Sequence, residues 1–116
     1  MEIREATLVD IPVMARAGKA WHDQMPYAEF LEYNENGIAE SLFDALADGK
    51  GRAWILWDEE KLVGLTLGHV MPNFYNPIQY GINCAFVAIL PQYQAQGWGT
   101  KFRAIIEQWG AEIGGK

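Results

Sequence analysis

The stretch Ile89-Leu-Pro-Gln-Tyr-Gln-Ala-Gln-Gly-Trp-Gly-Thr-Lys-Phe102 carries the most informative pattern in the chain. An apolar run typical of a strand ends at its proline, and an amphipathic helical pattern begins near Trp98. The two glycines between them allow tight backbone geometry and the close approach of a ligand. A strand, a glycine turn and a helix start together expose unpaired backbone N–H groups at the positive end of the helix, where phosphate binds well. The stretch therefore predicts an anion-binding turn.

The periodicity of the rest of the chain predicts the other elements of one domain, residues 1–116. The expected elements are a strand over 2–8, a helix from Asp10 to about His22, a helix over 35–47, strands over 53–57, 62–70 and 79–90, and a helix over 98–113. The second helix is expected to bury Ile38, Leu42, Phe43 and Leu46. The order is therefore β-α-α-β-β-β-α, an α/β (α+β) arrangement.

The spacing Gln-x-x-Gly-x-Gly from Gln94 to Gly99, after a strand that ends in Pro-x-Tyr, resembles the acetyl-CoA pyrophosphate loop of the GNAT superfamily of N-acetyltransferases. The resemblance implies a GNAT-like fold with a mixed, mostly antiparallel sheet flanked by helices, lacking the usual C-terminal β-α-β-β part. The fourth strand is then expected to be a sheet edge, which a second copy or another assembly partner would cover. The segment 14–33 is loosely similar to GNAT proteins encoded by bacteriophages.

The same resemblance implies where acetyl-CoA would bind. In the family, the fourth strand hydrogen-bonds the pantetheine arm and the loop N–H groups hold the pyrophosphate. The matching strand residues are Val87, Ala88 and Ile89, and the matching loop residues are Gln94, Ala95, Gln96, Gly97, Trp98, Gly99 and Thr100. An N–H of the strand usually polarises the acetyl carbonyl, which here implies Ala88 or Ile89.

The residues for proton transfer are less well marked. Acetyl transfer to an amine requires that the amine lose a proton and that the carbonyl oxygen be stabilised as it gains charge. Several members of the family have a glutamate where this chain has Asn83, and an amide cannot accept a proton at neutral pH. His69 and Tyr80 are the remaining candidates. A hydrogen-bonded surface histidine and a packing tyrosine are the structural alternatives.

Aromatic residues are frequent in the two segments that surround the acceptor in GNAT proteins, and they include Phe30. The candidate acceptor-binding residues are Trp21, His22, Tyr27 and Tyr75. Aromatic rings can hold an amine by cation–π contact. Simple burial, a protein interface or, for His22, a solvated helix end would explain the same residues.

Composition limits the partners and the compartment. The net charge of −6 argues against nucleic-acid binding, whereas backbone N–H groups can still bind the phosphates of CoA. No apolar run approaches the roughly 20 residues of a membrane span, and the N-terminus lacks the pattern of a signal peptide. The single cysteine, Cys84, fits a reducing compartment. We therefore expect a cytoplasmic protein without a metal, or a virion component if a bacteriophage encodes it.

Two functions remain open at this point. The first is an acetyl-CoA-dependent N-acetyltransferase that transfers the acetyl group directly to a primary amine of a small molecule or protein. The second is a catalytically inactive GNAT-like structural or interaction module, such as a phage virion component. The glycine loop favours the enzyme, while Asn83 and the expected open sheet edge favour the module.

Overall fold

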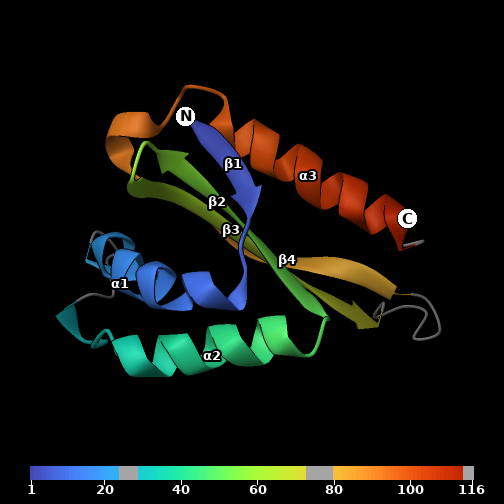
Figure 1. Cartoon of the computed structure of the whole chain (residues 1–116), viewed down its shortest axis with the longest axis horizontal. Coiled ribbons are helices and arrows are strands. Elements are labelled where there is room, and N and C mark those ends of the chain that lie inside the picture. The colour runs from blue at the N-terminus through green and yellow to red at the C-terminus, as the bar shows by residue number, and fades with distance from the viewer. Residues whose placement is uncertain (24–28, 73–79, 114–116) are drawn as a thin grey trace.

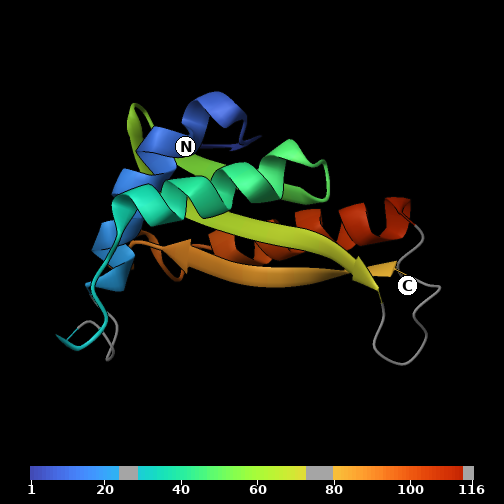
Figure 2. The same cartoon turned by 90° about the horizontal axis from the view of Figure 1, so that it is seen from below.

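The computed structural model describes residues 1–23, 29–72 and 80–113, with the backbone alone for 72, 80, 81 and 83–86. The strands β1 (Glu2–Glu5), β2 (Gly51–Asp58), β3 (Lys61–Pro72) and β4 (Tyr80–Ile89) form one antiparallel sheet in the order β1-β2-β3-β4. Helices α1 (Ile11–His22) and α2 (Glu35–Ala47) cover one face, and α3 (Trp98–Glu112) covers the other (Figures 1 and 2). The predicted order β-α-α-β-β-β-α is confirmed.

The sheet is buried on both faces, which explains the uninterrupted apolar run of β2. Successive side chains of a strand point to opposite faces. Ala53 and Ile55 accordingly pack with Met14 and Leu42 beneath α1 and α2. Trp54, Leu56 and Val63 pack on the other face against Phe102 and Trp109 of α3. The Trp54 and Trp109 rings meet edge to face, with their centroids 5.7 Å apart.

Asp10 connects the first strand to the first helix. A short 3-10 turn, η1 (Leu8–Asp10), precedes α1, and Asp10 is the N-cap residue of α1. Its buried carboxylate accepts hydrogen bonds from the Arg4 guanidinium at 2.9 and 3.1 Å and from the Thr7 N–H at 2.8 Å. The hydrogen bond from Arg4 is the main cause of a lowered pKa for the Asp10 carboxyl. The carboxylate therefore fixes the entry to α1 rather than capping that helix directly.

Two expectations about the elements are wrong. The first strand ends at Glu5 rather than residue 8, because the chain turns into η1. Phe43 and Ile38 are 52% and 38% exposed, although the apolar pattern of α2 assigns both to the buried face. Phe43 follows the buried Leu42 directly, and one helical step rotates a side chain by about 100°. The face of α2 that meets α1 and the sheet is therefore narrower than the pattern indicates.

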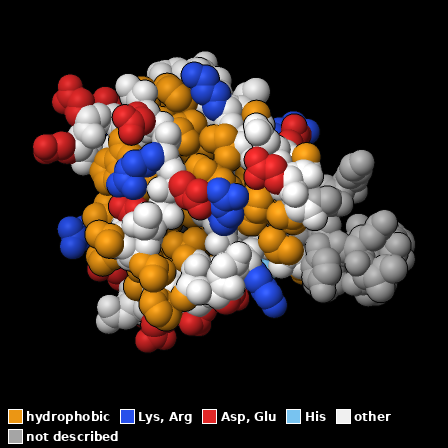
Figure 3. All heavy atoms as spheres, turned by 45° about the vertical axis from the view of Figure 1, so that its right-hand side comes forward, with side chains coloured by type: hydrophobic (Ala, Val, Ile, Leu, Met, Phe, Trp, Pro, Cys, Tyr) orange, Lys and Arg blue, Asp and Glu red, His pale blue; other side chains and the backbone are white. Residues whose placement is uncertain are grey.

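The surface carries charges of both signs. Figure 3 shows acidic and basic side chains interspersed with apolar ones over one face of the molecule. Within the described ranges, no helix has the length and apolar character needed to cross a membrane.

Candidate functional site

The turn between β4 and α3 presents the start of a helix without a side-chain cap. After the 3-10 turn η3 (Pro91–Tyr93), the backbone takes positive φ angles at Ala95 (62°) and Gly97 (86°). Gly97 is the N-cap of α3, and no side chain of the described residues caps this helix. The Lys101 N–H bonds the Gly97 carbonyl at 3.1 Å. The N–H groups before it have no acceptor within the helix and are available to an anion.

Side chains hold this turn in shape. The Gln94 Nε2 donates a hydrogen bond of 2.8 Å to the Ile89 carbonyl, which ties the loop to the end of β4. The Tyr93 hydroxyl donates to the Asp58 carboxylate at 2.7 Å, which ties η3 to the end of β2. The Gln96 Nε2 makes only a long contact of 3.4 Å with the Gln92 carbonyl. The loop is therefore fixed chiefly by Gln94 and Tyr93.

The two glycines of the turn, Gly97 and Gly99, differ in whether the backbone conformation requires a glycine. Gly97 needs its left-handed backbone, which L side chains rarely adopt. Gly99 lies inside α3, and a Cβ atom there would meet only the Ile89 Cδ1, at an ordinary 3.9 Å. Neither the conformation nor the packing of the protein requires a glycine at 99. The space in front of Gly99 is therefore free for a ligand.

The hydrogen-bonding phase of β4 decides which of its backbone groups are available. At the end of the β3–β4 ladder, the Leu90 N–H donates to the Val63 carbonyl at 2.9 Å. The next pairs along the ladder are Ile89 with Gly64 and Ala88 with Leu65. Since hydrogen-bonded pairs alternate along an antiparallel ladder, Ala88 turns its N–H and C=O toward β3. Val87 and Ile89 turn theirs to the open edge of the sheet. Of the two residues expected to polarise the acetyl carbonyl, Ile89 has the outward N–H.

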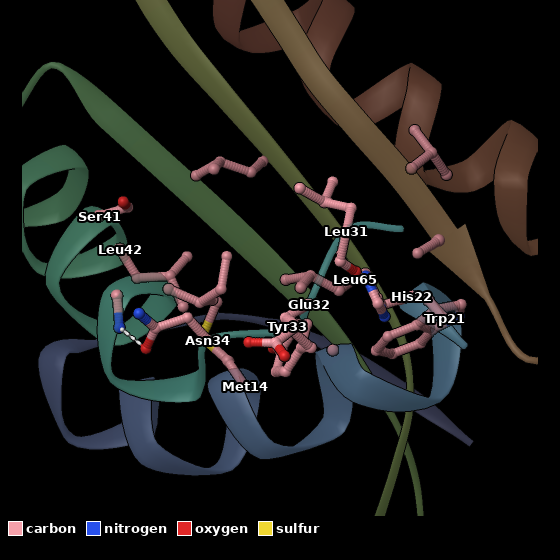
Figure 4. A pocket seen from close by; sticks show the side chains of 16 residues that line it. Met14, Trp21, His22, Leu31, Glu32, Tyr33, Asn34, Ser41, Leu42 and Leu65 are labelled. Carbon is pink, nitrogen blue, oxygen red and sulfur yellow. Dashed lines mark hydrogen bonds between the residues drawn. The ribbon is translucent and has the colours of Figure 1, made fainter. Parts of the chain in front are cut away.

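A cavity of about 820 Å³ opens beside this end of β4. Its lining comes from α1, the segment 31–34, α2, β3 and β4. The lining residues are Met14, Gly18, Trp21, His22, Leu31, Glu32, Tyr33, Asn34, Gly37, Ile38, Ser41, Leu42, Leu65, Leu67, Val87 and Ala88. In Figure 4, Trp21 and His22 project from the end of α1, Ser41 and Leu42 from α2, and Glu32 and Tyr33 lie between them. The cavity is thus lined both by two predicted acceptor-binding residues, Trp21 and His22, and by two predicted cofactor-binding residues, Val87 and Ala88.

His22 and Tyr33 also secure the segment that crosses the cavity. His22 Nε2 lies 2.5 Å from the Leu31 carbonyl oxygen, and its Nδ1 lies 3.3 Å from the Asp23 carboxylate. The ring centroids of His22 and Tyr33 are 5.4 Å apart, and the Tyr33 hydroxyl donates a hydrogen bond to the Ala15 carbonyl. Burial, with a smaller effect of the Glu35 charge, raises the pKa of the Tyr33 phenol, which therefore stays a neutral donor.

Of the remaining catalytic and acceptor-binding candidates, the structure describes only His69 in full. His69 pairs with Gly51 and Asn83 in the sheet and is not among the lining residues. Tyr80 begins β4, and its side chain lies outside the described part of the structure. Tyr27 and Tyr75 lie outside the described residues altogether. Their proposed roles stay predictions.

Sequence reasoning missed three polar residues of the lining, Glu32, Asn34 and Ser41. Asn34 caps α2, since its Oδ1 accepts from the Gly37 N–H at 2.9 Å, and this N-cap is the one signal that could have located the segment. Phe30, expected near the acceptor, is instead 83% exposed. The lining in this segment is formed by its neighbours.

A comparison with family models identifies the family of the chain. The sequence profile described as "Acetyltransferase (GNAT) family" matches residues 14–116. The chain belongs to the GNAT acetyltransferase family. The GNAT enzymes use acetyl-CoA to acetylate their substrates. A comparison with curated protein sequences found no match.

Solved structures agree with this GNAT fold. An integron cassette protein from the mobile metagenome of Cole Harbour Salt Marsh is 16% identical, with a TM-score of 0.85 over 98% of this chain and 72% of its own. An aminoglycoside acetyltransferase from an uncultured soil metagenomic sample, solved with sisomicin, is 19% identical, with a TM-score of 0.76 over 99% and 72%.

A third similar structure contains the cosubstrate. A predicted acetyltransferase from Clostridium acetobutylicum, solved with acetyl-CoA, is 12% identical, with a TM-score of 0.74 over 96% of this chain and 73% of its own. At these identities the three structures show the fold alone. The GNAT domain described here spans a little under three quarters of the length of these neighbours.

Proposed function

We propose that this GNAT domain is an acetyl-CoA-dependent N-acetyltransferase that transfers the acetyl group directly to a primary amine of a small molecule or protein. The observation that supports the proposal is the continuity of three features. An uncapped helix start with free space at Gly99, an open strand edge at Val87 and Ile89, and a large cavity follow one another along the end of β4.

The proposed placement of acetyl-CoA follows this continuity. The pyrophosphate binds the N–H groups of the turn, including those of Gly97, Trp98, Gly99 and Thr100. The pantetheine arm lies along the open edge of β4 and bonds the outward groups of Val87, because the Ile89 carbonyl already accepts from Gln94 Nε2. Val87 also lines the cavity, so the thioester reaches the cavity where this strand borders it.

The reaction is a direct displacement. The acceptor ammonium first gives one proton to a base. The amine nitrogen then forms a bond to the acetyl carbon, the C–S bond breaks, and CoA leaves as a thiolate. The nitrogen loses its second proton as the neutral amide forms, and the thiolate takes a proton from the acid. The outward N–H of Ile89 is the proposed donor to the carbonyl oxygen as that oxygen gains charge. His69 remains a proposed base and Tyr80 a proposed acid. His69 lies two residues beyond Leu67 along β3, about 7 Å, so a water molecule would have to relay the proton.

One observation favours the second function, a non-catalytic interaction module. β4 ends the sheet order, and Val87 on this strand is 46% exposed. An exposed edge can pair with another chain, which would make the domain a homo-oligomer or part of an assembly. A monomer in solution would count against this module.

Calorimetric titration with acetyl-CoA tests the proposed enzyme. We expect micromolar binding by the wild-type protein and loss of binding in Gly99→Glu, whose carboxylate would stand where the pyrophosphate approaches. The free space at Gly99 means that this variant should still fold. Ala104→Glu is the matched control, because it adds the same charge to an exposed position of α3 more than one turn farther on.

The outcomes separate the two functions. Binding by the wild type and Ala104→Glu but not by Gly99→Glu supports the proposed loop, and release of the CoA thiol with amines then measures turnover. Equal binding by all three proteins would mean that the phosphate site lies elsewhere. No binding by folded wild-type protein would leave the interaction module as the better description.

A further inference from the structure

We infer that the acceptor of this domain is a primary amine attached to an apolar hydrocarbon body, whose ammonium group pairs with the Glu32 carboxylate. The inference rests on the proposed function, because it takes the cavity beside β4 as the acceptor site. It adds the chemical class of the acceptor and a residue that selects it.

The inner wall of the cavity is hydrocarbon. Met14 from α1, Leu42 from α2 and Leu65 from β3 are each at most 5% exposed in the folded chain and also line the cavity. Leu67 and Ala88 continue this apolar surface across β3 and β4. A wall of this kind stabilises a ligand by removing its apolar surface from water, and it offers nothing to a hydroxyl group.

Glu32 is the one carboxylate among the described residues that line the cavity, and these residues include no lysine or arginine. The Glu32 side chain is exposed, and its carboxylate takes part in none of the ion pairs of the described residues. Figure 4 places it between the side chains of α1 and those of α2. A cation that enters the cavity therefore meets one unpaired negative charge.

The other polar side chains of the lining are mostly engaged within the protein. The Tyr33 hydroxyl bonds Ala15, His22 contacts Leu31, and the Asn34 side-chain oxygen accepts the Gly37 N–H. An amino sugar would need partners for many hydroxyl groups, and unpaired buried polar groups are costly. A negatively charged acceptor would be repelled by Glu32. An amine with one charged end and a hydrocarbon body satisfies Glu32 and the apolar wall. The one buried lining donor that it leaves open is Trp21 Nε1, which has no hydrogen-bond partner among the described residues.

The hydrocarbon wall is tested with a homologous series of linear primary amines, from propylamine to heptylamine. Each amine is titrated calorimetrically in the presence of saturating CoA, so that no acetyl transfer occurs. We expect the dissociation constant to fall about two- to fourfold for each added methylene, up to the limit of the cavity, in keeping with about 0.8 kcal/mol for a fully buried methylene. A flat series, or tighter binding of spermidine or sisomicin than of heptylamine, would overturn the inference.

The role of Glu32 is tested by a cycle that pairs Glu32→Gln with a change of ligand charge. The ligands are 2-phenylethylamine and its uncharged isostere 2-phenylethanol. We expect the variant to bind the amine about two- to fivefold more weakly and the alcohol unchanged, because an exposed ion pair is removed only for the cation. Glu40→Gln, the same change at an exposed carboxylate of α2 that does not line the cavity, should affect neither ligand.

The outcomes distinguish this inference from the proposed function. If neither acetyl-CoA nor CoA binds, the proposed function fails. The amine titrations without CoA then test on their own whether the cavity binds apolar amines. If CoA binds and the amine binds equally to Glu32→Gln and wild type, only the inference about Glu32 fails. An equal loss of amine and alcohol binding in Glu32→Gln would mean that the carboxylate shapes the segment instead of selecting a charge.

Discussion

Removing the Gln94 carboxamide should weaken acetyl-CoA binding without unfolding the domain. Gln94 Nε2 donates to the Ile89 carbonyl at 2.8 Å, and this bond connects the anion-binding turn to the strand proposed to bind pantetheine. In Gln94→Ala the turn loses that connection, while Tyr93 still holds η3 to Asp58. The turn would then sample other conformations before the ligand binds, and its ordering would subtract from the affinity.

The size of the effect follows from the geometry of one exposed hydrogen bond. Such a bond contributes about 0.5–1 kcal/mol net, because water replaces the lost partner when the donor is solvent-accessible. The dissociation constant for acetyl-CoA should therefore rise about two- to fivefold, at about 1.4 kcal/mol per tenfold. Gln94→Glu should weaken binding further at low salt, since a carboxylate cannot donate to Ile89 and also repels the pyrophosphate.

Calorimetry on Gln94→Ala and Gln96→Ala measures this prediction. Gln96 is the matched control, because it has the same side chain in the same turn, makes only a 3.4 Å contact and keeps its backbone N–H for the ligand when the side chain is truncated. Thermal unfolding of both variants shows whether the fold has changed. Wild-type affinity in Gln94→Ala, or an equal loss in Gln96→Ala, would refute the view that the hydrogen bond to Ile89 preorganises the turn.

Two further predictions concern stability. Asp10→Asn should lower the free energy of unfolding by about 1–3 kcal/mol at neutral pH. Because Arg4 lowers the folded-state pKa of Asp10, the stabilisation by the carboxylate is complete above its unfolded pKa of about 4 and disappears as the pH falls through the folded pKa. Urea unfolding at several pH values should therefore show the stabilities of the two proteins converging in acid. Phe102→Ala, at a side chain with 0% exposure, should cost about 3–5 kcal/mol, whereas Phe43→Ala on the exposed side of α2 should cost less than about 1 kcal/mol in the same assay. Similar costs for the two phenylalanines would contradict the burial of α2 described above.

The elements were predictable because their signals are local. The apolar run of β2 and the glycine turn before α3 each depend on neighbours a few residues away. The bounds of α2 agree with the prediction to the residue. The error at Phe43 has a different origin, since the width of a buried helix face depends on which elements pack against it. The sequence pattern marks that face but does not set its limits.

The cavity was only partly predictable, because it forms between elements distant in sequence. Trp21 and His22 lie on the helical stripe of α1 and were expected near the acceptor. Glu32 carries no motif, and its place depends on the path of segment 31–34, which contacts with His22 and Tyr33 fix against α1. The position of Phe30 depends on the same path: although this aromatic residue is only two positions before Glu32, its side chain is exposed to solvent.

The net charge of −6 and a polyanionic cosubstrate are compatible because the two proposed ligands would be held by different kinds of group. The turn offers backbone N–H dipoles, whose direction is set by the start of α3 and does not depend on the side-chain charges. Lys101 adds one positive charge in the first turn of that helix, where its ammonium lies 4.2 Å from the centroid of the Trp98 ring. The cavity offers the opposite charge through Glu32. A cationic acceptor and an anionic donor can then bind at adjacent sites, because each site presents its own local field.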